Sequence, residues 1–163
     1  MTPLRKNITR RLFLSLIGLA VSSIGVLSNA SAQGLVTFKK SMLTIKTAKF
    51  NTKFSVEMAI SAQQQSQGLM FRRSMAADAG MLFDYRIPQR ISMWMKNTYI
   101  PLDMIFIGSD GKVINIAERT IPQSETVISS KGRARAVLEV NGGTASRLGI
   151  KPGDQVKHSI FNN

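Results

Sequence analysis

The sequence predicts a mainly β (α+β) fold: a small, mostly antiparallel, barrel-like single domain with two short helices. Many short apolar segments alternate with turn residues, the pattern of antiparallel sheets. Asp110-Gly111 separates two such segments, 104–107 and 112–118, and this dipeptide favours a tight hairpin. Because closure removes exposed edge strands, we expect the sheet to close into a small barrel.

The clearest strand is predicted over residues 53–60. Phe54, Val56, Met58 and Ile60 alternate with polar or small residues, so these four should face the core. The other strands are expected over 43–50, 80–85, 90–96, 104–107, 112–118, 134–140 and 155–161.

Two short helices interrupt the strands. Ser61 and Gln64 have the spacing of a capping box, and Gly68 should end the helix that they begin. The second helix is expected over 144–148, with Gly149 as its end.

Residues 1–32 have the three parts of an export signal. A basic start with Arg10-Arg11 precedes an apolar stretch and the small residues 30–32. The run 9–14 is similar to the twin-arginine motif, which favours that route over general secretion. We expect cleavage between Ala32 and Gln33 and a periplasmic or secreted protein without stable membrane insertion; an uncleaved anchor is the alternative.

A flexible leader, 33–41, and one domain, 42–163, should remain after cleavage. The chain has no cysteine, which excludes disulfides, thiol catalysis and cysteine metal sites. Its 22 Lys and Arg outnumber 9 Asp and Glu, but they are scattered. In an exported protein this excess favours anionic small molecules or envelope surfaces over nucleic acid, with a merely solvated basic surface as the alternative. We expect no cofactor and no metal.

Residues 94–103 hold the densest set of chemically useful side chains. Trp94 could offer a flat platform for a sugar or another ring, while Lys96, Asn97 and Asp103 could supply donors and acceptors. In the structural alternative, Trp94 is a core residue, and Asn97 and Asp103 satisfy backbone groups in a turn.

Two further residues could reach this region from other elements. Arg72 with Lys96 could bind a carboxylate or phosphate, or Arg72 could form an internal ion pair with Glu139 or Asp103. The candidate ligand-binding set is therefore Arg72, Trp94, Lys96, Asn97, Asp103 and Glu139.

Short segments carry a family resemblance: 68–72, 80–83, 94–98, 101–103, 138–139, 148–150 and 153–154. In this order and spacing they resemble domain of unknown function family 192 (DUF192), found in bacteria and archaea, over about residues 60–157. The resemblance implies a single β-rich domain and assigns no catalytic role.

A small binding or accessory module for a polar or anionic ligand, or for an envelope glycan, is the favoured function. One alternative is a carbohydrate-active enzyme with Asp103 and Glu139 as its two carboxyls. A protein-interaction module is another, because 142–156 superficially resembles part of a PDZ-like domain. A third is a monovalent copper site at Met93 and Met95, whose thioethers suit that ion.

Overall fold

The computed structural model describes residues 36–161. The predicted export signal, with its cleavage site between Ala32 and Gln33, lies outside the described residues. The prediction of a mainly β domain with two short helices is confirmed. The elements are β1 Lys39–Lys46, β2 Asn51–Ala59, α1 Ala62–Gln67, β3 Ala79–Gln89, β4 Ser92–Met93, β5 Leu102–Ile107, β6 Val113–Thr120, β7 Ile128–Ser129, β8 Ala134–Asn141, α2 Thr144–Leu148 and β9 Gln155–Lys157.

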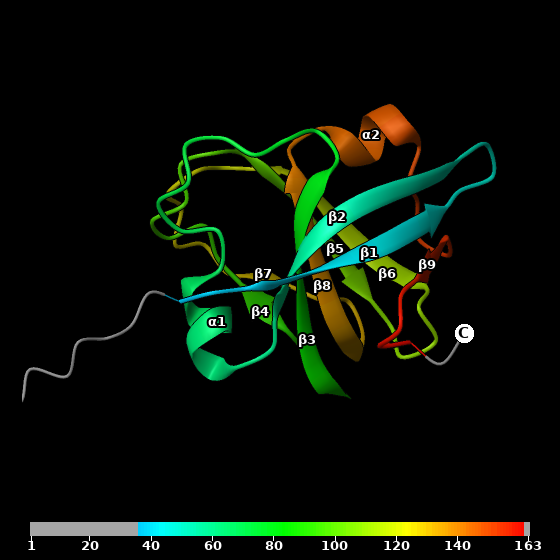
Figure 1. Ribbon diagram of the computed structural model, residues 1–163, viewed down its shortest axis with the longest axis horizontal. Coiled ribbons are helices and arrows are strands. Elements are labelled where there is room, and N and C mark those ends of the chain that lie inside the picture. Colours follow the sequence, from blue (N-terminus) through cyan, green and yellow to red (C-terminus); the bar gives the residue numbers. More distant parts are fainter. Residues whose placement is uncertain (1–35, 162–163) are drawn as a thin grey trace, which may run out of the picture. The chain divides into compact units, whose positions relative to one another are not determined.

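Seven strands form one curled sheet in the order β6-β5-β8-β3-β2-β1-β9, and β4 pairs with β7 in a small separate ribbon. Every pair in the curled sheet is antiparallel except β2 and β3, which are parallel. A parallel pair needs a long crossover, and here residues 60–78 provide it, including α1 (Figure 1). The crossover matters because α1 and its following loop help to enclose a cavity.

The curled sheet is a half-barrel whose two edges meet beside the β5–β6 hairpin. Lys112 forms an isolated bridge with Gln155. The amide of Val156 donates to the Gly111 carbonyl at 2.8 Å, and the amide of Val113 donates to the Asp154 carbonyl at 2.9 Å. These bonds pair some of the backbone groups where the two edges meet.

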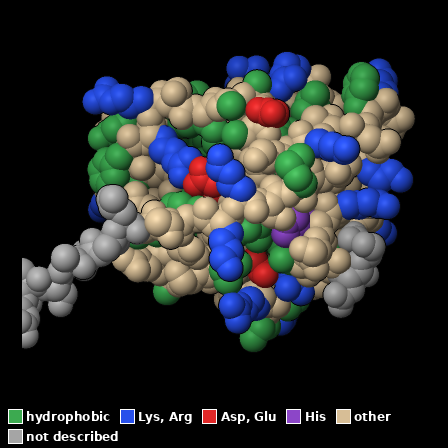
Figure 2. Space-filling model, in the orientation of Figure 1, with side chains coloured by type: hydrophobic (Ala, Val, Ile, Leu, Met, Phe, Trp, Pro, Cys, Tyr) green, Lys and Arg blue, Asp and Glu red, His purple; other side chains and the backbone are tan. Residues whose placement is uncertain are grey.

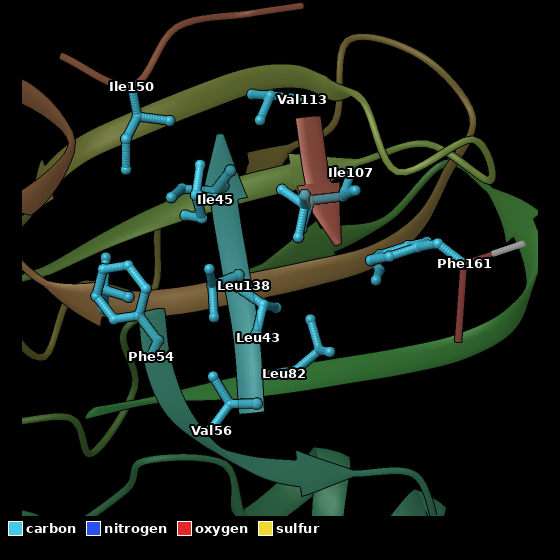
Figure 3. Close-up of a cluster of buried hydrophobic side chains, with 14 of the residues drawn as sticks. Leu43, Ile45, Phe54, Val56, Leu82, Ile107, Val113, Leu138, Ile150 and Phe161 are labelled. Carbon is cyan, nitrogen blue, oxygen red and sulfur yellow. The ribbon is translucent and has the colours of Figure 1, made fainter. Parts of the chain in front are cut away.

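A hydrophobic core fills the inner face of the sheet. Leu43, Phe54, Val56, Leu82 and Leu138 point into it from four strands (Figure 3). Their alternation along each strand confirms the inward placement predicted for Phe54, Val56 and Met58. Ile60 differs: it lies just beyond β2 and is 37% exposed, because its amide donates to the Gln64 side chain at the start of α1.

A second core covers the outer face. Met81, Phe83, Met104, Phe106 and Val137 belong to this cluster. They alternate along β3, β5 and β8 with residues of the inner core, so the centre of the sheet is buried on both faces. This explains why all six residues of β5 are buried.

Several predicted strand boundaries are corrected: the strand expected over 43–50 ends at Lys46, and the strand expected over 155–161 ends at Lys157. Strand β1 begins at Lys39, within the expected leader 33–41, because Lys39 and Lys40 pair with β2. The strand expected over 90–96 is reduced to β4, because the chain turns directly after Met93. The turn is held by Met95, whose amide donates to the Ser124 carbonyl and whose carbonyl accepts from the Thr98 amide.

Candidate functional site

A cavity of about 340 Å³ lies on the outer face of the sheet. Strands β3 and β8 contribute to it, and α1, its following loop and the chain from β4 to Thr98 complete the lining. Apolar groups form much of the wall, and side-chain amides and hydroxyls contribute the rest. The lining residues are Gln65, Ser66, Gln67, Gly68, Leu69, Met70, Phe83, Tyr85, Ser92, Met93, Trp94, Lys96, Thr98, Val127 and Glu139.

Helix α1 is fixed at the cavity by its caps and by Gln65. The predicted capping box is confirmed, with Ser61 and Gln64 bonding reciprocally. The Gln65 amide donates to the Asp84 carbonyl of β3 at 3.0 Å. Gly68 ends the helix with φ +46°, and a Cβ there would lie 3.2 Å from the Phe83 ring. Glycine therefore allows the helix to end directly against the cavity wall.

Glu139 is the buried acid of the cavity. On β8 it lies between Met81 of β3 and Met104 of β5, each its direct partner in register. The residue is 4% exposed, its carboxyl has no hydrogen-bond or ion-pair partner within residues 36–161, and its oxygens are accessible from the cavity. Desolvation by burial raises the pKa of Glu139 to about 8. The carboxyl is therefore mostly protonated at neutral pH, as a neutral donor and acceptor at the cavity.

The other ionisable groups of the cavity are Tyr85 and Lys96. Burial and the negative charge of Glu139 raise the pKa of Tyr85 to about 12, so the phenol stays neutral. Its hydroxyl donates to the Met93 sulfur at 3.4 Å. Lys96 Nζ lies 5.5 Å from the centre of the Trp94 ring and 3.3 Å from Glu125. The cavity thus combines one buried acid with one half-exposed cation.

Three of the six candidate residues meet at this cavity: Trp94, Lys96 and Glu139. Trp94 is 49% exposed, so it is not the core residue of the structural alternative. Met93 and Met95 do not form a shared sulfur site, because Met93 faces Tyr85 whereas the buried Met95 sulfur accepts from Thr120 at 3.1 Å. Nor does the described part of the chain contain a cluster of three metal-binding His, Asp or Glu residues.

Asp103 lies on the opposite face of the sheet. It is fully buried, and its carboxylate accepts three backbone N–H bonds, from Arg119 at 2.7 Å, Gly143 at 2.9 Å and Ala145 at 2.7 Å. These bonds join β5, β6 and the start of α2, as in the structural alternative. Asp103 and Glu139 cannot flank one glycosidic bond from opposite faces, which argues against the two-carboxyl enzyme.

Arg72 pairs with Glu57 instead of the expected Glu139 or Asp103. The guanidinium contacts both carboxylate oxygens of Glu57, at 2.9 and 2.5 Å. Hydrogen bonding from Arg72 lowers the pKa of Glu57. Both residues border a neighbouring cavity with Phe38, not the one beside Glu139. The expected internal partners of Arg72 were therefore wrong.

Asn97 is a turn residue. Its φ is +57°, and its carbonyl accepts a hydrogen bond from the Phe71 amide at 2.8 Å. Asparagine tolerates this left-handed conformation better than most residues. Its side chain makes a long contact of 3.9 Å with the Met70 sulfur. Asn97 therefore positions the loop that carries Lys96 without lining the cavity itself.

The sequence model of the DUF192 family, described as an uncharacterized ACR, matches residues 43–158. The chain belongs to the DUF192 family. The match confirms the resemblance seen in the short segments, and it brings no assigned activity.

Two solved structures are similar to this DUF192 protein. One is a Sinorhizobium meliloti 1021 protein provisionally named a transcription regulator; it is 45% identical with a TM-score of 0.75, over 78% of this chain and 99% of that one. The other is a Novosphingobium aromaticivorans DSM 12444 protein of unknown function, 41% identical with a TM-score of 0.74, over 77% of this chain and 89% of that one. No curated protein matches.

Several cavity residues of the DUF192 domain were missed from sequence. Phe83 and Tyr85 could have been found from the period-two alternation of β3, which places them on the face of Met81. Gln65 and Met70 carry no comparable signal, because the crossover brings them to β3 only in three dimensions.

The described residues contain no helix long and apolar enough to cross a membrane.

Proposed function

We propose that this DUF192 protein is a binding module for a small molecule and that the cavity beside Glu139 is its site. The observation that carries the proposal is a carboxyl that is almost fully buried, lacks a protein partner and borders a cavity. The carboxyl oxygens remain accessible from the cavity, because no side-chain N or O atom of residues 36–161 is both fully buried and unpaired. A ligand in the cavity can therefore hydrogen-bond Glu139 directly.

The size and lining of the cavity support a small ligand. Binding clefts commonly enclose about 300 to 1,000 Å³ and combine apolar walls with a few polar groups. The present cavity is at the lower end of this range. It suits one or two rings, or the terminal unit of a glycan, better than an extended chain.

The basic surface and the N-terminal sequence support a location outside the cytoplasm for this binding module. All nine acidic residues follow residue 32, with all but four of the 22 lysines and arginines. Figure 2 shows Lys and Arg side chains spread over much of one face. Together with the signal-like pattern of residues 1–32, this supports a protein that works in the periplasm or outside the cell.

Trp94 makes the proposal directly testable. It is the only tryptophan, and it lines the cavity. We expect some members of a set of small aromatic, polar and monosaccharide compounds to change its fluorescence in a saturable way. Calorimetry should give matching dissociation constants.

Two matched variants locate the binding. Ser92→Phe places a ring at an exposed position of the cavity lining, whereas Ser146→Phe places one at an exposed position of another cavity. Ser92→Phe should weaken binding at least about tenfold, the factor set by a loss of 1.4 kcal/mol. Ser146→Phe should have no effect. The proposal fails if no compound binds, or if binding ignores Ser92→Phe.

A further inference from the structure

The chemistry around Glu139 points to a particular class of ligand. We propose that the cavity receives a protonated amine carried on an apolar or aromatic body, and that the amine binds at the Glu139 carboxyl. This inference rests on the small-molecule function proposed above, because it names what that site selects.

The distribution of charge in the cavity sets the orientation of the bound ligand. Among the residues that line the cavity, Glu139 is the sole acid and Lys96 the sole permanent cation. Glu139 is 4% exposed, whereas the Lys96 side chain is 43% exposed and pairs with Glu125. Once Glu139 ionises, an amine is attracted to the buried end, whereas Lys96 repels it at the exposed end. A ligand carboxylate would meet the reverse arrangement and would have to lie outward.

The walls also suit a cation better than a sugar. Phe83 and Tyr85 present aromatic rings, and Met70 and Met93 present polarizable thioethers. Ring faces attract ammonium groups, and the attraction strengthens where water is excluded. A sugar needs several free hydrogen-bonding groups along its length, but the Gln65 amide and the Tyr85 hydroxyl already donate to protein atoms.

Binding of an amine should release a proton. In the empty cavity Glu139 is mostly protonated below pH 8. An ammonium group favours the carboxylate, so the carboxyl proton passes to the solvent as the complex forms. Tyr85, which interacts electrostatically with Glu139, does not interfere, because burial raises its pKa to about 12 and the phenol stays neutral in this pH range. Amine affinity should therefore rise between pH 6 and 8, approaching tenfold per pH unit.

Three compounds of the same size test the inference: 2-phenylethylamine, 2-phenylethanol and phenylacetate. Trp94 fluorescence and calorimetry at pH 8 should show the amine binding at least about tenfold more tightly than the other two, as expected for a charge-assisted hydrogen bond. At pH 7, calorimetry in two buffers of different ionisation enthalpy should show release of most of one proton with the amine and none with the alcohol.

The variant Glu139→Gln should bind the amine and the alcohol equally within about threefold, with no proton release. Circular dichroism checks that it is folded, and the proton count on the wild-type protein tests the inference independently of any variant. Equal binding of amine and alcohol by the wild-type protein, or amine binding without proton release, would overturn the amine assignment and leave small-molecule binding intact. Absence of binding by all three compounds and by the wider set would overturn both.

Discussion

Two buried carboxyls lie on opposite faces of the same sheet, and their surroundings differ completely. Asp103 on β5 is paired in register with Val140, and Glu139 on β8 is paired with Met104, so the two acids are one residue apart across neighbouring strands. Asp103 accepts three backbone hydrogen bonds. Glu139 accepts none from the described residues and borders a cavity.

The difference shows that burial alone does not assign a role to an acid. Asp103 replaces water with protein donors and thereby holds α2 and β6 to the sheet. Glu139 has no donor among the described residues, and its carboxyl opens to a cavity from which a donor could reach it. The proposed role of Glu139 therefore rests on the missing partner and not on the residue type.

The largest effect should come from Asp103→Ala. Three buried N–H groups would lose their acceptor, so we expect unfolding free energy to fall by about 4 kcal/mol in urea denaturation at pH 7. Asp103→Asn keeps one acceptor oxygen, so its unfolding free energy should fall clearly less than that of Asp103→Ala. A loss below about 1 kcal/mol for the alanine variant would break the comparison, because Asp103 would then be no more structural than Glu139.

Glu139→Gln should raise the free energy of unfolding, by somewhat less than Asp103→Ala lowers it. The size of this gain should depend on pH. The folded-state pKa, about 8, lies above the ordinary value of 4.5, so the native protein holds a proton that the unfolded chain has released. Wild-type stability should therefore fall as pH rises from 4.5 to 8, by at most ~1.4 kcal/mol per unit.

The glutamine variant lacks this dependence. It should match the wild type in urea denaturation near pH 4.5 and exceed it by about 3 kcal/mol at pH 8.5, allowing for water in the cavity. Subtracting the two proteins cancels the contribution of His158, whose pKa is lowered by burial. A constant difference at both pH values would show that Glu139 is not held protonated.

A third carboxyl, Glu57, lies in the same row of register-paired residues across the sheet as Glu139. Glu57 is paired in register with Met81, which in turn is paired with Glu139, but Glu57 has Arg72 as its partner. Arg72→Ala should lower the free energy of unfolding by about 1 to 2 kcal/mol at pH 7, as expected when a half-buried ion pair loses one member.

The cost of Arg72→Ala should vanish in acid. Arg72 lowers the pKa of Glu57, so the stabilisation is present above the ordinary pKa and lost as pH falls through the folded-state value. Arg73→Ala is the matched control, because Arg73 contacts the Tyr99 ring and forms no ion pair within residues 36–161. Its effect should stay within about 0.5 kcal/mol. Equal losses in acid and at neutral pH would contradict an ionic role for Arg72.

Tyr85→Phe should have the smallest effect. It removes a weak bond to the Met93 sulfur, so we expect about 0.5 kcal/mol in thermal or urea unfolding. The pH dependence assigned to Glu139 should persist, because Tyr85 makes no hydrogen bond to it. Disappearance of that dependence would mean that Tyr85 is the missing partner of Glu139.

Local features of the fold could be predicted from sequence. The capping box of Ser61 and Gln64, the Asp110-Gly111 hairpin and the alternation of Phe54, Val56 and Met58 depend on residues a few positions apart. Such signals survive folding because the groups that satisfy one another are neighbours in the chain.

The candidate site was only partly predictable, because it depends on long-range pairing. Trp94 and Lys96 stood out by type, and Glu139 was included, but Asp103 is an equally plausible acid in sequence. Only the register of β3, β8 and β5 places Glu139 between two methionines, and only the parallel crossover brings α1 over it. The Arg72–Glu57 pair was missed for the same reason, since it joins the crossover to β2.

The pairing of β9 with β1 has a consequence for synthesis of the protein. Val156 pairs with Ile45, more than a hundred residues earlier, and is fully buried in the inner core. A nascent chain cannot complete the half-barrel until the segment containing β9 has left the ribosome. Until then the edge of β1 that β9 covers lacks its partner, and an unpaired strand edge can pair with other chains.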